Sequence, residues 1–346
     1  MPRQIDLTKL LSWLIIFVGF SNNPSIAKET ADLTIAFGSC ADQNRQQPIW
    51  NTVAEHKPDL FIFMGDNVYI DSSDPIKMTN AYQTLANEPY FSEFRKDVPI
   101  VATWDDHDYG IFDGGKEFTG KYDAKKSFIY FFNYPEINRL TQLEQGLFHT
   151  RWLKFKDKNI QVILLDTRWY RDELVKTYLS VAQRTSLKLG PYQPNLDQSS
   201  TMLGEQQWKW LEGEFKKTAD LRILVSSIQV LPEFSGWETW ANFPHERERL
   251  LNLIQQNKSE TIILSGDAHH AEISSLQHRG QRILEITSSG LAVKTYPMST
   301  NIHRQGKSYD KLNYGILSIK EDEKITVVAD IFSAAGDKAL TVKLGE

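Results

Sequence analysis

The chain has 346 residues, of which 41% are hydrophobic and 12% aromatic, enough for one large domain or two modest ones. Its 39 basic and 44 acidic residues give a net charge of −5, which argues against a protein that binds nucleic acid through a basic surface. The single cysteine, Cys40, has no partner for an internal disulfide and is either a buried core residue or a functional thiol.

The N-terminus has the pattern of an export signal. An apolar run, Leu10–Phe20, follows basic residues and leads to small residues that end at Ala27. The run is shorter than the roughly 20 residues of a membrane-spanning helix. We expect residues 1–27 to be a cleaved signal of the general secretory type, because no twin-arginine pair is present, and 28–346 to form a single domain that is periplasmic or secreted. An uncleaved anchor or a wrongly assigned start is the alternative.

Short runs rich in β-branched and aromatic residues predict strands along the chain. These runs are Leu33–Phe37, Leu60–Met64, Ile100–Thr103, Ile160–Leu165, Arg222–Ser226, Thr261–Leu264, Ile283–Thr287, Tyr314–Ile319, Ile325–Phe332 and Leu340–Leu344. Helical patterns cover Pro48–His56, Gly204–Thr218 and Pro244–Gln256, with an apolar, buried helix over Phe128–Tyr134. Leu174–Ser200 lacks periodicity and predicts a long surface loop. Strands alternating with helices indicate an α/β architecture.

Four of these strands are each followed by residues that can bind metals or transfer protons. The tails supply Cys40, Asp66, Tyr69, Asp106, His107, Asp108, Asp267 and His269. Ligands bind beyond the carboxyl ends of strands in an open α/β sheet, so we expect these side chains to meet there. One Gly-Asp tail would be an ordinary turn, but four tails place several carboxylates together. Metal ions are the usual way to offset their repulsion.

The order of the tails resembles the metallophosphoesterase superfamily, whose skeleton runs GD, then GNHD or GNHE, then GHxH. Gly65-Asp66, Asp105–Asp108 and Gly266–His269 occupy these three places. Asp106 stands where the middle motif has Asn, and Asp267 stands where the last motif has its first His. These departures, with the preceding GSC motif, look like the PhoD-like (alkaline phosphatase D) family.

Three further motifs, LDTRWYR, TMLGEQQWKWL and WETWANFPHERERLL, also look like that family. The resemblance covers roughly Thr34 to Leu291. It implies a metallophosphoesterase-like β-sandwich flanked by helices, with metals at the C-terminal edges of the strands.

The resemblance also implies the metals and their ligands. A trivalent iron, Fe3+, would be held by Cys40, Asp66, Tyr69 and His269, and Ca2+ by Asp66, Asp106 and Asp267. Two divalent ions would leave these five anionic side chains with a net negative charge, whereas one Fe3+ with two Ca2+ would make the site positive and attractive to phosphate. Another divalent pair, such as Zn2+ or Mn2+, is the alternative. Asn67, Asp105, Asp113 and His270 are expected to support the ligands.

The implied activity is an exported, metal-dependent phosphatase or phosphodiesterase in which a metal-bound hydroxide attacks phosphorus. His107 is the candidate for protonating the leaving oxygen, with Asp108 orienting its ring. Arg168 is the candidate for gripping phosphate oxygens, unless Asp166 or Asp172 simply holds it.

Two alternatives to this activity remain open. The same site suits a phospholipase C-like or nuclease phosphodiesterase, and metals could instead staple a non-catalytic surface binding protein. We expect substrates that are small phosphate esters or derive from phospholipid or nucleic acid. We expect no specific nucleic-acid binding, no membrane span after signal cleavage and no protein partner. The preference for monoesters or diesters is left open.

Overall fold

The computed structural model describes residues 32–296, 300–321 and 324–344, so the predicted signal peptide lies outside the described residues. Its strands are β1 (Leu33–Ala41), β2 (Leu60–Met64), β3 (Ile100–Thr103), β4 (His149–Phe155), β5 (Lys158–Leu164), β6 (Val175–Lys176), β7 (Tyr192–Gln193), β8 (Leu221–Ser226), β9 (Glu260–Ser265), β10 (Ala271–His278), β11 (Gln281–Ala292), β12 (Asn313–Glu321), β13 (Ile325–Ser333) and β14 (Lys338–Leu344). Its helices are α1 (Ile49–Glu55), α2 (Pro75–Asn87), α3 (Pro89–Asp97), α4 (Asp106–Tyr109), α5 (Lys121–Phe132), α6 (Pro135–Asn138), α7 (Val181–Leu187), α8 (Gly204–Phe215) and α9 (Pro244–Gln255), with short 3-10 turns at Arg139–Gln142 and Trp240–Asn242.

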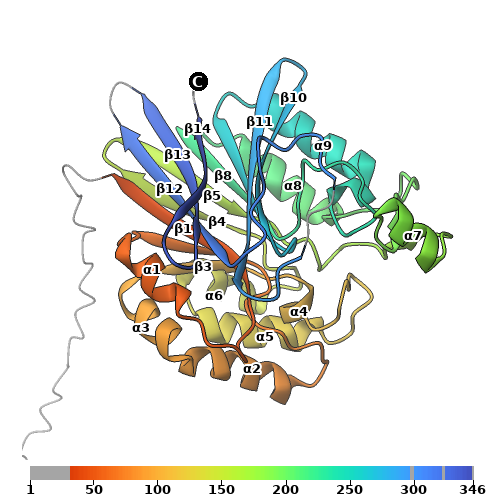
Figure 1. Ribbon diagram of the computed structural model, residues 1–346, viewed down its shortest axis with the longest axis horizontal. Helices are drawn as coiled ribbons and strands as arrows, with labels where there is room; N and C mark the ends of the chain where they lie inside the picture. The colour runs from red at the N-terminus through yellow and green to blue at the C-terminus, as the bar shows by residue number, and fades with distance from the viewer. Residues whose placement is uncertain (1–31, 297–299, 322–323, 345–346) are drawn as a thin grey trace, which may run out of the picture.

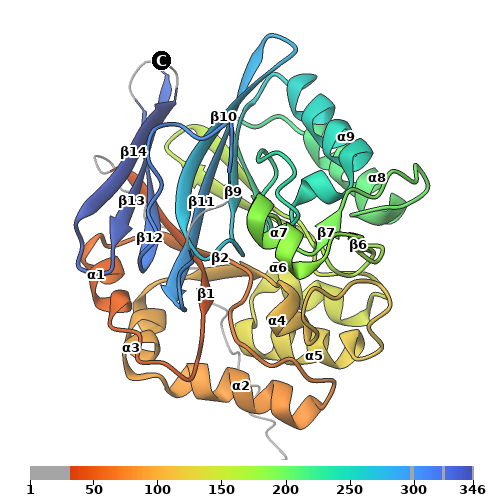
Figure 2. The ribbon, with the colours of Figure 1, turned by 45° about the vertical axis from the view of Figure 1, so that its right-hand side comes forward.

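Twelve of the described strands form one large sheet that folds into two halves. The first half runs β3-β2-β1-β12-β13-β14 and the second runs β4-β5-β8-β9-β11-β10. They are joined where β1 runs parallel to β11, with Ser39 opposite Ser289. Helices α1, α2, α3 and α5 lie on one side of the strands and α8 and α9 on another (Figures 1 and 2). The predicted α/β sandwich flanked by helices is confirmed.

Alternate residues of the central strands face different layers, as the period of two in a strand requires. Val162 belongs to the core shared by the two halves, whereas its neighbour Ile163 belongs to a second cluster with Trp208 of α8 and Leu250 of α9. Because both faces are buried, the strand sequences read as continuous apolar runs. This packing fixes the register of the strands and therefore where each one ends.

The strands that carry the candidate ligands run parallel to one another. β1 pairs in parallel with β2, β2 with β3, and β9 with both β8 and β11. Their carboxyl ends therefore open toward the same edge of the molecule. No helix in the described part of the chain is long and apolar enough to cross a membrane.

The structure corrects several predicted elements. The predicted loop Leu174–Ser200 contains β6, α7 and β7. The predicted helix Phe128–Tyr134 is the end of the longer α5, and it is not buried all round, since Tyr130 is 83% exposed. Elements β4, β10, α2, α3 and α4 were not predicted. Helices α2 and α3 are rich in polar residues, and β4 alternates between the core and solvent.

His149 at the start of β4 makes the fold sensitive to acid. Its Nε2 lies 2.7 Å from the Tyr134 hydroxyl and its Nδ1 2.5 Å from the Leu147 carbonyl, an arrangement that suits a neutral ring. Burial lowers its pKa from 6.5 to about 4. The unfolded chain therefore binds a proton at His149 more readily than the folded chain does. The unfolding free energy is highest above pH 6.5 with respect to this group, and it decreases as pH falls toward 4.

We expect wild-type protein in chelator to lose about 3 kcal/mol of unfolding free energy from this group across that interval, measured by urea denaturation. His149→Gln is expected to remove most of this loss, since the amide does not titrate. His278→Gln, on a partly exposed residue at the end of β10, is the matched control and is expected to keep the wild-type pH dependence. An unchanged pH dependence in His149→Gln would contradict the assignment.

Candidate metal centre

Four strand ends meet at one edge of the sheet. Cys40 at the end of β1 donates its backbone N–H to the Gly65 carbonyl at 3.3 Å. Gly266, after β9, donates in the same way to Ser227 at 3.0 Å. Gly65 has φ +102°, and a Cβ there would lie 2.6 Å from the Asp105 Cβ, so only glycine lets β2 and β3 come this close.

The backbone of the candidate ligands is held in a costly conformation. Cys40, Asp66, Asp267 and His269 all have positive φ, at 63°, 50°, 61° and 52°. Non-glycine residues adopt this left-handed region only when their surroundings impose it, and such residues cluster at functional sites. The fold thus turns these four side chains toward one point at the expense of local backbone strain.

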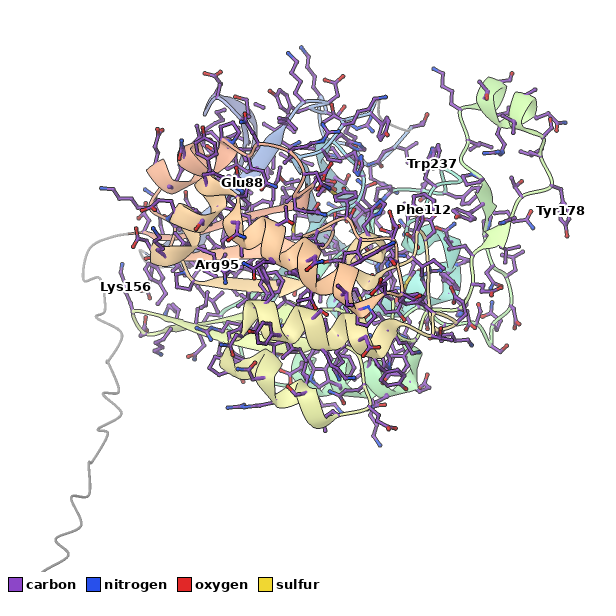
Figure 3. The ribbon with its side chains drawn as sticks, turned by 90° about the horizontal axis from the view of Figure 1, so that it is seen from below. Glu88, Arg95, Phe112, Lys156, Tyr178 and Trp237 are labelled. Carbon is purple, nitrogen blue, oxygen red and sulfur yellow. The ribbon has the colours of Figure 1, made fainter. Side chains whose placement is uncertain are left out.

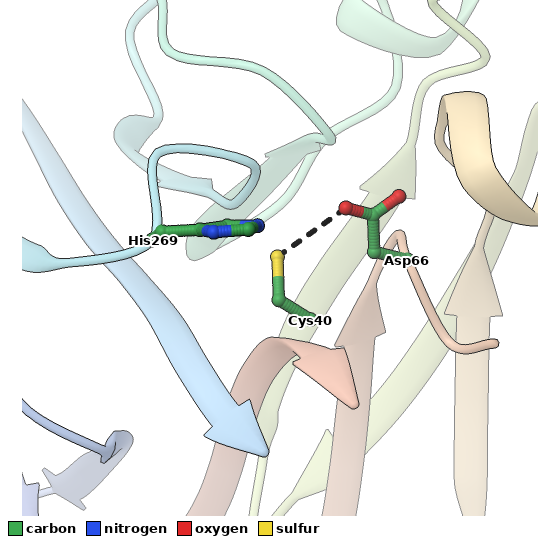
Figure 4. Close-up of side chains that lie close together, drawn as sticks. All are labelled: Cys40, Asp66 and His269. Atoms are coloured by element: carbon green, nitrogen blue, oxygen red, sulfur yellow. Dashed lines mark hydrogen bonds between the residues drawn. The ribbon is translucent and has the colours of Figure 1, made fainter. Parts of the chain in front are cut away.

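The side chains converge as the sequence predicted. Candidate ligand atoms in three groups lie within 4.8 Å of one another, and the groups are Cys40–Asp66–His269, Asp66–Asp106–His107 and Asp66–Asp105–Asp106–Asp267. Asp66 belongs to all three groups. Its Oδ2 is 3.5 Å from the Cys40 Sγ (Figure 4) and 3.3 Å from the Tyr69 hydroxyl, which is also 3.3 Å from the His269 Nε2.

The negative charge of the acidic part of the cluster is only partly compensated, by the Arg168 guanidinium beside Asp105. Burial raises the pKa of Asp66 and Asp267 well above the usual range, and the neighbouring negative side chains raise both further. Asp105 Oδ2 and Asp106 Oδ1 are buried and accept no hydrogen bond from the described residues. Buried carboxylate oxygens without donors are costly unless a cation or a proton satisfies them. The donor set therefore fits a cation with oxygen ligands.

The sulfur and imidazole side fits a stronger Lewis acid. Burial raises the pKa of the Cys40 thiol to about 12, although Ser289 and Ser39 hydroxyls near the sulfur lower it. A thiolate at this place needs a strongly charged cation beside it. Burial lowers the pKa of His269 to about 4. Its Nδ1 lies 2.9 Å from the Lys294 carbonyl, where it can donate a hydrogen bond. The Nε2, which faces the Tyr69 hydroxyl, then keeps a lone pair that can bind a metal.

His107 has a different partner from the predicted one. Its Nδ1 lies 2.9 Å from both carboxylate oxygens of Asp71. Asp108, which the sequence predicted as the orienting residue, instead accepts hydrogen bonds from the backbone N–H groups of Asp105 at 2.6 Å and Asn67 at 3.2 Å. Asp108 thus fixes the turn after β3. Burial lowers the pKa of His107, but Asp71 and Asp106 outweigh it and raise the pKa overall.

Arg168 lies inside the protein and not at the surface of the site. It is fully buried, its Nε donates to Asp105 at 2.6 Å, and its two terminal nitrogens grip Glu238 at 2.8 and 2.7 Å. Asp105 and Glu238, and not the predicted Asp166 or Asp172, hold the guanidinium. A contact between Arg168 and substrate phosphate stays a prediction. Arg168 holds the Asp105 carboxylate in the acidic group.

Sequence reasoning missed several residues that shape the centre. Asp105 was expected to be a supporting residue, yet its carboxylate lies among the candidate ligands. Asp71 and Glu238 were not singled out, although Glu238 lies in the WETW motif. The Asp113 backbone N–H donates to Asp106 Oδ2 at 2.8 Å, in the supporting place expected for it. The three aspartates between positions 105 and 108 could have identified Asp105 as a candidate ligand. No local sequence pattern could have predicted that Glu238 pairs with Arg168.

Comparisons with known proteins agree with this architecture. The family of PhoD-like phosphatases matches residues 35–326. Alkaline phosphatase D of Bacillus subtilis (strain 168) is 24% identical in an alignment 297 residues long that covers 73% of this chain and 48% of that protein. The chain therefore spans about half the length of the curated relative it matches.

Solved structures share the fold. The structure of PhoD superposes with a TM-score of 0.65 at 17% identity, covering 93% of this chain and 73% of that one. A dimetal phosphatase from Danio rerio gives a TM-score of 0.54 at 13% identity, covering 91% and 99%. GAP50, described as the anchor in the inner membrane complex of Plasmodium, gives 0.56 at 14% identity, covering 91% and 89%. At these identities the likeness establishes the fold alone.

Proposed function

The chain belongs to the PhoD-like phosphatase family, and we propose that it is a metal-dependent hydrolase of phosphate esters. One observation carries the proposal: the four strand tails bring the donor atoms of Cys40, Asp66, Asp106, Asp267 and His269 into groups no wider than 4.8 Å. A cluster of buried anions of this kind is suited to hold cations that in turn attract phosphate.

The donor chemistry favours two kinds of cation. Cys40, Tyr69 and His269 supply sulfur, phenol and imidazole next to Asp66, a set that suits Fe3+ because both thiol and phenol bind best when ionised. Asp66, Asp105, Asp106 and Asp267 supply oxygens alone, a set that suits Ca2+. A pair of other divalent ions, such as Zn2+ or Mn2+, is the alternative, and elemental analysis of the purified protein separates the two. Absorption in the visible range would support an iron–phenolate or iron–thiolate pair.

We assign the steps of phosphate ester hydrolysis to bound cations and to individual residues. Bound cations would polarise a phosphoryl oxygen and lower the pKa of an attacking water. We assign to His107, whose Nδ1 lies 2.9 Å from the Asp71 carboxylate, the donation of a proton to the leaving oxygen. Arg168 is a positioning residue, because it holds the Asp105 carboxylate in place.

The role of His107 predicts a dependence on the leaving group. His107→Ala is expected to lower kcat by about 10²-fold or more for an alkyl phosphate, whose leaving oxygen needs a proton, and to leave p-nitrophenyl phosphate nearly unchanged. Asp71→Asn, which keeps the ring but weakens its orientation, is expected to give a smaller loss in the same direction. Measuring kcat for both esters tests this.

Asp74→Asn is the matched control for Asp71→Asn, since Asp74 only caps α2. Equal losses on both esters in His107→Ala would point to a ligand or structural role. Wild-type turnover of the alkyl ester would remove His107 from the mechanism.

The class of ester is tested with p-nitrophenyl phosphate and bis-p-nitrophenyl phosphate, each with and without added calcium. Turnover of the monoester supports a phosphatase, and turnover of the diester supports a phospholipase C-like or nuclease phosphodiesterase. Failure to hydrolyse either, with metals bound, would favour a non-catalytic metal-stapled binding protein. We further propose that residues 28–346 form one catalytic domain and that 1–27 direct it to the periplasm or outside the cell.

A further inference from the structure

A narrow projection, here called the arm, extends from the body of the molecule and consists of β6, α7 and β7. The arm comprises residues 175–193 and is closed at its root by antiparallel pairing of Val175 with Gln193. Figure 3 shows it standing clear of the body, with Tyr178 at its outer edge. Between the two short strands lies α7, none of whose residues is buried.

The arm keeps its shape without a core. Ser180 and Gln183 form a reciprocal capping box at the start of α7. At the root, Gly190 donates to the Ser235 carbonyl at 3.0 Å, and a Cβ on Gly190 would lie 2.1 Å from the Gly236 oxygen, so only glycine permits this contact. Local caps and a fixed root therefore contribute to the shape of the arm, and no residue of α7 is buried in a core.

Three of the apolar side chains of the arm are turned to solvent. Tyr178 is 94% exposed, Val181 69% and Leu187 59%. Scattered exposed apolar residues are common on soluble proteins, but these three lie within ten residues of one another on one small projection, where they are available for contact with a partner surface.

All the charged side chains of the arm are positive. Lys176, Arg184 and Lys188 lie within it, and no acidic residue does, although the whole chain carries a net charge of −5. Cations interleaved with an aromatic and aliphatic side chains match the boundary between anionic headgroups and acyl chains. The same charges disfavour pairing of one arm with the arm of a second copy, because like charges would face one another.

The root of the arm adjoins the metal centre. The Tyr192 hydroxyl donates to the Asp113 carboxylate, and the Asp113 backbone N–H donates to Asp106 Oδ2 at 2.8 Å. Trp237, 52% exposed, follows the Gly236 contact at the root (Figure 3). Hydrogen bonds therefore link the root of the arm to the candidate site.

We propose that the arm docks this protein on an anionic phospholipid surface through Tyr178, Val181 and Leu187, with Lys176, Arg184 and Lys188 supplying the attraction to headgroups. The contact is weak and reversible, because stable anchoring needs more apolar area or a lipid chain. The proposal does not depend on catalysis, since the arm contributes no candidate metal ligand.

The test is co-sedimentation of the mature chain with two vesicle preparations, phosphatidylcholine alone and phosphatidylcholine with phosphatidylglycerol. We expect pelleting with the anionic vesicles, loss of pelleting at high salt, and much weaker pelleting with phosphatidylcholine. Replacing Lys176, Arg184 and Lys188 by Gln is expected to weaken binding on the order of a hundredfold, about fivefold per cation. Replacing Tyr178, Val181 and Leu187 by Ser is expected to weaken it about tenfold or more.

The control variant, Ile76→Ser/Lys77→Gln/Tyr130→Ser, removes exposed apolar side chains and a cation from α2 and α5. It is expected to bind like the wild type. Hydrolysis of soluble p-nitrophenyl phosphate is expected to be unchanged in every variant, so a failed docking test and a failed catalytic proposal are distinguishable. Equal binding to both vesicle types, wild-type binding by the arm variants, or pelleting without vesicles, which would indicate self-association, would each overturn the proposal.

Discussion

Asp66→Asn is expected to lower kcat/KM for p-nitrophenyl phosphate on the order of a thousandfold and to release bound metal. Loss of a residue that merely supports a ligand commonly costs 10–100-fold, and Asp66 is shared by all three candidate ligand groups. The amide keeps the size of the side chain but removes the negative charge that two cations would share. The measurement is steady-state kinetics with elemental analysis of the same samples.

Two further observations separate this effect from misfolding. In chelator, Asp66→Asn is expected to be at least as stable as the wild type, because the variant removes one of several buried carboxylates that repel one another. The control is Asp97→Asn at the exposed end of α3, which is expected to keep both activity and metal. Wild-type metal content together with wild-type activity in Asp66→Asn would contradict the shared-ligand assignment.

Arg168→Met is expected to destabilise the protein by about 3–5 kcal/mol in urea denaturation, the usual cost of breaking a buried ion pair. The substitution leaves the Asp105 and Glu238 carboxylates buried without their cation. Activity is expected to fall as well, through a lower kcat as Asp105 moves. A residue that gripped substrate phosphate would instead raise KM and leave the folded protein stable.

The double variant Arg168→Met/Glu238→Met sharpens the test. If the loss comes from unpaired charge, removing Glu238 as well is expected to restore part of the stability. Arg45→Met, which breaks the exposed pair with Asp42, is expected to change stability by less than about 1 kcal/mol. Losses in the double variant equal to the sum of the two single losses would show that the pair is not coupled.

Much of this architecture could be predicted because its signals are local in the sequence. Strands such as Leu60–Met64 are short apolar runs closed by glycine, and parallel strands end at a common edge. Tyr69 and His269 could therefore be placed together although they are 200 positions apart in the sequence. The family motifs then supplied the fold and the metal hypothesis. The family and the sandwich are confirmed, whereas the metals and the residue roles remain proposals.

The rest depended on contacts that no local pattern encodes. Asp108 follows His107 directly, yet the helical turn after β3 points its carboxylate at the backbone of Asn67, and Asp71 from another segment reaches the imidazole. Arg168 follows a strand, as a substrate-binding residue would. Inside the protein, however, it pairs with Glu238, which lies 70 positions away in the sequence. The arm read as a loop because a short capped helix without buried residues has no hydrophobic period.

The central claim is that Cys40, Asp66, Asp106, Asp267 and His269 act together by holding cations. The most direct test is turnover of p-nitrophenyl phosphate by wild-type protein after exhaustive chelation, with elemental analysis confirming that metals are gone. We predict that activity disappears and returns when the native metals are restored. Full turnover by demonstrably metal-free protein would contradict the account.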